Sequence, residues 1–91
     1  MLHIVNKTAS LDVCRRFAQP GHAVLLIEDG VLAATRADLL GDTAASLKVY
    51  ALQPDLAARG MGGRLQPGIT TVDYAGFVEL VATHSNNQSW L

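Results

Sequence analysis

The longest apolar run of the chain ends abruptly in charged residues. Five apolar residues occupy Ala23–Ile27, Glu28-Asp29-Gly30 follows, and a second apolar patch covers Val31–Ala34. Because the run does not alternate between apolar and polar positions, neither of its faces is expected to contact water. This is typical of a central strand in a parallel sheet that is covered by helices on both sides. The carboxyl end of such a strand is the edge at which open α/β sheets place ligands.

The residues after this run predict a turn into a helix that extends from Gly30 to about Leu40. Asp29 is expected to cap that helix through its carboxylate, and Gly30 to give the backbone freedom to turn. Neighbouring residues of a strand point to opposite faces, so Glu28 and Asp29 do not converge on one ligand. Helix capping therefore accounts for Asp29 better than a carboxylate pair or a metal site does.

Strand-like and helix-like segments alternate along the rest of the chain. The expected strands are Leu2–Val5, Ala23–Ile27, Leu47–Leu52 and Ile69–Val72. The other expected helices are Leu11–Gln19 with Ser10 or Thr8 as N-cap, Gln53–Arg59, and a last helix that begins after a cap at Asp73. This alternation predicts a single α/β domain over residues 1–91, with three α/β/α layers and a mainly parallel sheet of four or five strands.

Two of these helices carry an apolar stripe that is expected to face the sheet. The stripe of the first helix consists of Leu11, Cys14, Phe17 and Ala18, and the stripe of the last helix consists of Tyr74, Phe77, Val78 and Val81. Trp90, close to the end of the chain, is expected to pack in an ordered way rather than to sit on a free tail.

The composition is unusually apolar for a chain of this size. Hydrophobic residues make up 49% of the 91 residues and charged residues only 16%. A domain this small buries only about 60–65% of the surface that its unfolded chain exposes, so its own core is marginal. The simplest explanation is that other subunits cover part of the apolar surface, so we expect the protein to form oligomers.

The charged and metal-binding residues exclude several functions. The net charge is −1, and Arg15-Arg16 is the only adjacent basic pair, so direct contact with nucleic acid is not expected. The Cys and His residues lack the spacing of a zinc site, and neither a metal nor a cofactor is expected. No apolar run approaches the roughly 20 residues that span a bilayer, and no signal peptide is recognisable, so we expect a soluble, cytoplasmic protein without membrane contact.

Cys14 is the one strong nucleophile by residue type, and it has two interpretations. It can carry sulfur as a persulfide, activated by Arg15, Arg16 or the start of its helix. It can also be a packing residue of its apolar stripe, since free cysteines are among the most buried residues. The segment Gly60–Gly63 follows a helix and has no Gly-Lys-Ser/Thr ending, so it is a weak match to a phosphate-binding loop. His3 has no partner in the sequence that marks it as catalytic.

Five ordered blocks, spread over nearly the whole chain, resemble the TusB/DsrH family. They are Met1–Lys7, Val24–Val31 with Ala33 and Ala34, Lys48–Leu52 with Asp55, Leu56 and Ala58–Gly60, Val72–Tyr74 with Phe77 and Val78, and the closing Trp90. The start Leu2–Lys7 and the final Trp make this resemblance more specific than a likeness of fold.

The resemblance implies a DsrE-like fold and a place in a sulfur-relay complex of the TusBCD or DsrEFH type, a heterohexamer. The partners it implies are TusC/DsrF-like and TusD/DsrE-like subunits, with TusA-like and TusE/DsrC-like sulfur carriers as indirect partners. In the Tus branch such complexes pass persulfide sulfur for 2-thiolation of the tRNA wobble uridine, and in the Dsr branch they serve sulfur oxidation. The main active cysteine of these complexes belongs to the TusD/DsrE subunit.

The resemblance also bears on Cys14, which falls where DsrH-type members carry a cysteine in their first helix. Several TusB members lack that cysteine, so the resemblance adds weight to Cys14 as an auxiliary persulfide site without making it the main one. Two other hypotheses remain open. One is a stand-alone thiol enzyme that works through Cys14, and the other is a small-molecule binding module at the strand end formed by Asp29-Gly30.

Overall fold

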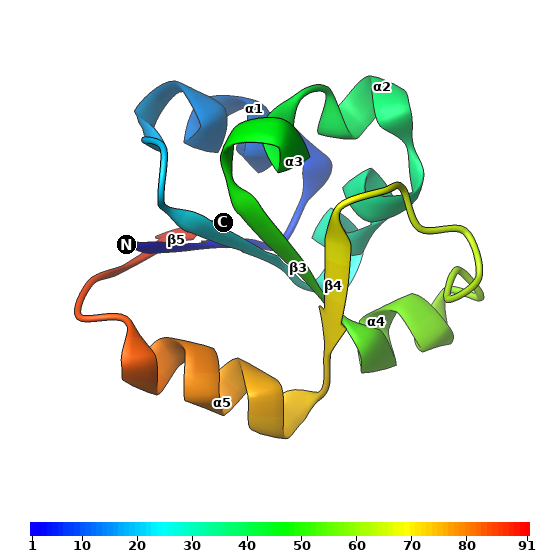
Figure 1. Cartoon of the computed structure of the whole chain (residues 1–91). Coiled ribbons are helices and arrows are strands. Elements are labelled where there is room, and N and C mark those ends of the chain that lie inside the picture. The colour runs from blue at the N-terminus through cyan, green and yellow to red at the C-terminus, as the bar shows by residue number, and fades with distance from the viewer.

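The predicted strands form one parallel sheet, and a further strand extends it at one edge (Figure 1). The computed structural model describes the whole chain, Met1 to Leu91. The strands are β1 (Leu2–Val5), β2 (Ala23–Leu26), β3 (Lys48–Leu52), β4 (Ile69–Val72) and β5 (Asn87–Trp90). All neighbouring pairs are parallel, and the order is β4-β3-β2-β1-β5. The expected α/β architecture is therefore confirmed, with five strands.

The helical segments connect these strands by crossovers. They are α1 (Thr8–Phe17), the 3-10 helix η1 (Glu28–Thr35), α2 (Ala37–Leu40), α3 (Thr43–Ser46), α4 (Gln53–Ala58) and α5 (Tyr74–Thr83). None of them has the length and apolar character that a membrane-spanning helix requires. Figure 1 shows α1, α2 and α3 on one side of the sheet and α5 on the other.

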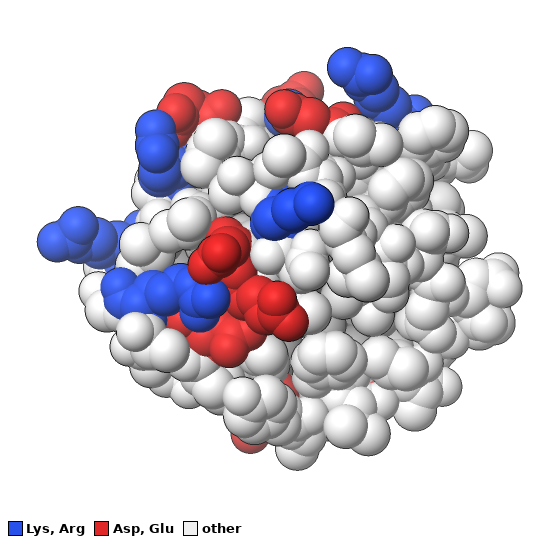
Figure 2. Space-filling view, turned by 180° about the vertical axis from the view of Figure 1, so that it is seen from behind, with Lys and Arg blue, Asp and Glu red and all other residues white.

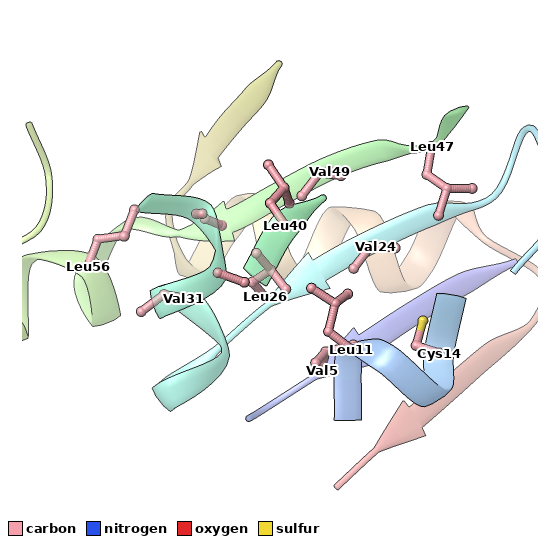
Figure 3. Packing of buried hydrophobic residues seen from close by; sticks show 13 residues of the cluster. Val5, Leu11, Cys14, Val24, Leu26, Val31, Leu40, Leu47, Val49 and Leu56 are labelled. Carbon is pink, nitrogen blue, oxygen red and sulfur yellow. The ribbon is translucent and has the colours of Figure 1, made fainter. Parts of the chain in front are cut away.

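The core lies mainly between the sheet and the helices on the α1 side. Thirteen buried residues form one cluster there, to which β2 and β3 contribute every second side chain and β1 contributes Val5 (Figure 3). A smaller cluster of Leu2, Ala23 and Leu25 lies on the opposite face, where Phe77, Leu80 and Val81 of α5 cover it. All four residues of β2 are buried, as expected for a central strand without alternation.

The segment after β2 differs from the expected continuous helix. It forms η1 and then, after Arg36, the short helix α2. Asp29 is not the N-cap, because Ile27 occupies that position and no side chain caps the helix. Gly30 does not need an unusual backbone angle, since the positive φ falls on Glu28 at 49°. A Cβ at Gly30 would instead lie 2.4 Å from the Val5 carbonyl oxygen, so this glycine is required for close approach to β1.

The two predicted apolar stripes are only partly correct. In α1, Leu11 and Cys14 are buried, whereas Phe17 is 63% exposed. The predicted caps of α1 are also wrong, because Lys7 occupies the N-cap position and makes no side-chain bond, and Thr8 and Ser10 lie inside the helix.

In α5, two residues of the predicted stripe lie on the outer face, since Tyr74 is 62% and Val78 67% exposed. Leu80 takes their place beside Phe77 and Val81. The helix is apolar on several sides, so its own periodicity does not select the buried face. Its predicted cap is confirmed, because the Asp73 carboxylate accepts a 2.7 Å hydrogen bond from the Gly76 N–H.

Candidate functional site

The thiol of Cys14 lies inside the main core cluster. Its side chain is fully buried, and α1 turns it toward the sheet together with Leu11 (Figure 3). Burial raises the pKa of the Cys14 thiol to about 11, since the thiolate would lose its hydration there. At neutral pH the sulfur is therefore a protonated thiol, which is a weak nucleophile.

The nearby arginines do not activate this thiol, because burial is what displaces its pKa. Arg15 pairs with Asp12, one helical turn back, and also reaches the Leu40 carbonyl at 3.4 Å. Arg16 and Arg15 lie in the last turn of α1, where cations interact favourably with the helix dipole. The surroundings of Cys14 are thus those of a packing residue, as one of the two sequence interpretations expected.

The carboxyl ends of β2 and β3 carry an ion-paired network. The Arg59 guanidinium donates to the Asp29 carboxylate from Nη2 at 2.9 Å and from Nε at 3.1 Å. The Asp55 carboxylate accepts a 2.6 Å bond from the Glu28 backbone N–H. Figure 2 shows acidic and basic side chains gathered in such mixed groups rather than in a patch of one sign. These contacts join η1 to α4, so Asp29 and Asp55 act as structural links between two elements.

The hollows of the surface lie away from the predicted site residues. Their volumes are about 390, 380 and 220 Å³. The first lies between α2, α3 and the segment Gln66–Gly68, and the third is lined by Arg15, Asp42 and Thr43, among others. None of the three is lined by Cys14, Asp29 or Gly30. The hypothesis of a small-molecule module at the strand end therefore has no cavity to support it.

The glycine-rich segment after α4 behaves as a helix end. Gly60 has a φ of 65°, the left-handed conformation that commonly closes a helix, and its N–H bonds the Ala57 carbonyl at 3.0 Å. The segment joins α4 to β4, so it follows a helix, as the sequence indicated. It does not have the strand–loop–helix order of a phosphate-binding loop.

Sequence reasoning missed one polar cluster, which joins the two ends of the chain. His3, only 1% exposed, lies between Trp90 and His22. The Trp90 Nε1–H donates to His3 Nδ1 at 3.0 Å, and His3 Nε2 lies 2.9 Å from His22 Nδ1. No local sequence pattern predicts this cluster, because it depends on the pairing of β5 with β1 over a separation of more than 80 residues.

These features define a class of protein. The chain is a small three-layer α/β protein with a parallel sheet, whose thiol is built into the core and whose strand-end carboxylates hold helices together. A family model described as "DsrH like protein" matches residues 5–87. The chain belongs to this DsrH-like family.

Full-length relatives agree with this assignment. The chain is 37% identical to Protein TusB of Escherichia coli O81 (strain ED1a), over 99% of this chain and 100% of the relative. It is 35% identical to Protein TusB of Salmonella enteritidis PT4 (strain P125109), with the same coverage. Together, the family and these relatives support a sulfur-relay subunit as the general role of the protein.

Proposed function

We propose that the protein is a structural subunit of a sulfur-relay complex that passes persulfide sulfur between carrier proteins. Its relationship to TusB over essentially the full length of both chains is the observation that carries the proposal. In this proposal its partners are a TusC/DsrF-like and a TusD/DsrE-like subunit, and the sulfur passes through a cysteine of the latter. TusA-like and TusE/DsrC-like carriers deliver and receive the sulfur.

The position of Cys14 supports a structural rather than a catalytic role. A persulfide forms when a thiolate attacks the outer sulfur of a donor protein's persulfide, so that the donor's S–S bond breaks and the donor thiolate leaves. The attacking sulfur must therefore lie at a surface that the donor can reach. Cys14 is protonated at neutral pH and fully buried, so α1 would have to leave the sheet before a carrier could reach the sulfur. An auxiliary persulfide on Cys14 thus depends on such an opening.

The surface of the molecule supports burial against other chains. Phe17, Tyr74 and Val78 are large apolar side chains that the isolated chain leaves mostly exposed. In Figure 2 the lower part of the molecule, where α5 lies in Figure 1, is almost free of Lys and Arg. Surface with few charged side chains is what the centre of a permanent interface requires.

We further propose that the relay ends in 2-thiolation of the wobble uridine of tRNA, in the cytoplasm. The relatives that match over their full length are TusB proteins, which supports this branch over sulfur oxidation. A net charge of −1 fits a subunit that serves tRNA modification without binding tRNA itself. A role in a DsrEFH-type complex of sulfur oxidation is the alternative within the same family.

The test is reconstitution of the complex from this chain and the two sister subunits of the same organism. A tag on this chain should recover both sisters in a stable complex, and the complex should transfer radiolabelled persulfide sulfur from the TusA-like to the TusE-like carrier. Cys14→Ser in this chain should leave the transfer rate within about twofold. A matched cysteine substitution in the TusD/DsrE-like subunit should abolish transfer.

Two results would overturn the proposal. One is the absence of any complex with the sisters, and the other is loss of transfer with Cys14→Ser in a complex that still assembles, which would favour the thiol enzyme. Whether the relay ends in tRNA thiolation or in sulfur oxidation is tested by deleting the gene and measuring 2-thiouridine in tRNA by mass spectrometry. An unchanged 2-thiouridine content together with a defect in sulfur oxidation would assign the chain to the DsrEFH-type alternative.

A further inference from the structure

Three aromatic residues from three parts of the chain form a continuous hydrogen-bonded cluster, which we call the histidine clasp. His3 belongs to β1, His22 precedes β2, and Trp90 ends β5. The indole N–H of Trp90 bonds His3 Nδ1 at 3.0 Å, and His3 Nε2 lies 2.9 Å from His22 Nδ1. The ring of Trp90 also stacks on Phe17 of α1, with centroids 5.5 Å apart. The clasp thus ties the last strand to the first strand and to α1.

The chemistry of the three rings permits one arrangement of protons. An indole N–H can only donate, so His3 Nδ1 must be the unprotonated acceptor. Neutral His3 therefore carries its proton on Nε2 and donates it to His22 Nδ1. His22 Nδ1 also accepts from the Gln19 backbone N–H at 3.2 Å, so the proton of neutral His22 lies on Nε2. Both imidazoles must be neutral for every bond to form.

An additional proton on either imidazole disrupts this arrangement of hydrogen bonds. On His3 it must go to Nδ1, where it meets the indole N–H of Trp90 at a heavy-atom distance of 3.0 Å. On His22 it must also go to Nδ1, which already accepts two N–H groups, from His3 and Gln19. In each case an acceptor becomes a donor and faces other donors. At His3, which is 1% exposed, this leaves buried polar groups without partners, whereas Gln19 is exposed.

The groups that act on His3 all disfavour such a proton. Burial first, and then His22 and the amino group of Met1, lower the pKa of His3. The last turn of α1 contributes the cations Arg15 and Arg16 and the protonated thiol of Cys14, while Asp12 of the same helix is paired with Arg15. The backbone of Lys48 bonds the His22 carbonyl, and β5 and β2 contribute no titratable side chain.

We propose that the histidine clasp is a protonation switch that holds β5 on the sheet while His3 is neutral and releases Trp90 when His3 takes up a proton on Nδ1. As an edge strand, β5 pairs with β1 alone, so its release breaks one ladder and leaves the rest of the sheet intact. The release of β5 exposes the outer edge of β1 and the face of the Trp90 ring that packs on the protein. The inference goes beyond the sulfur-relay proposal and does not depend on it.

The test uses the full chain, in which Trp90 is the only tryptophan and gives a single indole resonance. At pH 7.5, the ¹⁵N shifts of the imidazoles should show the proton on Nε2 of both His3 and His22. The protection factor of the indole N–H, measured against free indole at the same pH, should fall by up to about tenfold per pH unit below pH 6.5. Tryptophan emission should shift to longer wavelength over the same range.

Two variants separate the clasp from general acid effects. In His3→Asn, the amide oxygen can replace Nδ1 as the acceptor for Trp90 and does not titrate, so the protection factor at pH 5.5 should stay within about twofold of its value at pH 7.5. His22→Asn keeps the His3–Trp90 bond but removes one of the groups that lower the pKa of His3, so the fall should begin at a higher pH than in the wild type. His84→Asn is the matched control, because His84 lies at the end of α5 and contacts the Leu80 carbonyl instead, and it should behave as the wild type.

Several outcomes would overturn the proposal. They are a wild-type protection factor that does not change between pH 7.5 and 5.5, a proton on Nδ1 of His3 at pH 7.5, a full fall in His3→Asn, or a fall in His22→Asn that begins at a lower pH than in the wild type. If His3→Asn does not fold, the wild-type tautomers and the behaviour of His22→Asn still decide the question.

Discussion

Gly30 and Cys14 show how little room the centre of the molecule leaves around single residues. A Cβ added at Gly30 would lie 2.4 Å from the carbonyl oxygen of Val5, which is backbone and cannot rotate away. Cys14 is fully buried beside Leu11. The close packing around each residue leaves no space for a larger one. Predictions for these two positions therefore do not depend on the function.

Substitution Gly30→Ala should destabilise the fold by about 1–3 kcal/mol, the usual cost of overpacking a core, because β1 or η1 must shift to admit the methyl group. The free energy of unfolding in urea measures this. Gly62→Ala is the matched control, since no atom lies within 4 Å of its Cβ position, and it should change stability by at most about 0.5 kcal/mol. Equal losses in the two variants would contradict the close approach of Gly30 to Val5.

Alkylation reads the accessibility of Cys14 directly. In the native chain at pH 8, iodoacetamide should leave Cys14 unlabelled, because burial excludes the reagent and raises the pKa of the thiol to about 11. In urea the same thiol should react fully, which serves as the control, and mass spectrometry measures both. Rapid labelling of the folded chain would instead favour a carrier role for Cys14.

At the scale of elements, α5 shows that the buried face of a largely apolar helix is determined by how the helix packs on the sheet. Phe77, Leu80 and Val81 pack on the sheet, whereas Tyr74 and Val78 point outward. The Asp73 cap fixes where the helix begins, and the position of β4 fixes its direction. Apolar residues on the outer face of α5 are therefore available to a partner without weakening the chain itself.

A pair of aspartate substitutions tests this assignment of faces. Val81→Asp should destabilise the isolated chain by about 1–3 kcal/mol, because it places a carboxylate against the apolar face of the sheet. Val78→Asp, which is 67% exposed, should change the stability by no more than about 0.5 kcal/mol. Urea unfolding followed by circular dichroism measures both. A loss for Val78→Asp as large as that for Val81→Asp would mean that the predicted stripe, which contains both residues, was right and the observed face wrong.

At the scale of the whole molecule, the two ends of the chain lie on neighbouring strands. β5 pairs with β1, with Leu2 opposite Asn87 and Val5 opposite Trp90. The terminal strands are thus coupled through the His3–Trp90 bond as well as through the backbone ladder. Protonation of His3 should therefore be visible in the stability of the entire fold.

Folding stability should decrease as the pH falls below 6.5, the ordinary value of a histidine pKa. Because the pKa of His3 is lowered in the folded chain, the unfolded chain binds this proton more tightly. The contribution is complete above pH 6.5 and is lost toward the folded pKa, at up to about 1.4 kcal/mol per pH unit. Urea unfolding between pH 7.5 and 5 should show a smaller slope for His3→Asn than for the control His84→Asn. Identical slopes would contradict the assignment.

The sequence by itself determined the elements that depend on short-range pattern. The unbroken run at Ala23–Leu26 is a fully buried strand, Asp73 caps α5, and Gly60 follows the end of α4. The candidate Cys14 was placed correctly on the inner face of the first helix, because periodicity acts within a few residues. Five blocks of residues also identify the family without any knowledge of tertiary contacts.

Only the tertiary structure decided which residues meet across the sheet. Asp29 pairs with Arg59, 30 residues away, and His3 bonds Trp90 at a separation of 87 residues. The same holds for the crowding of Gly30 by Val5 and for the buried face of α5. The physical reason is that these contacts follow from strand order and register, which place distant segments side by side, whereas propensity and periodicity act only along the local chain.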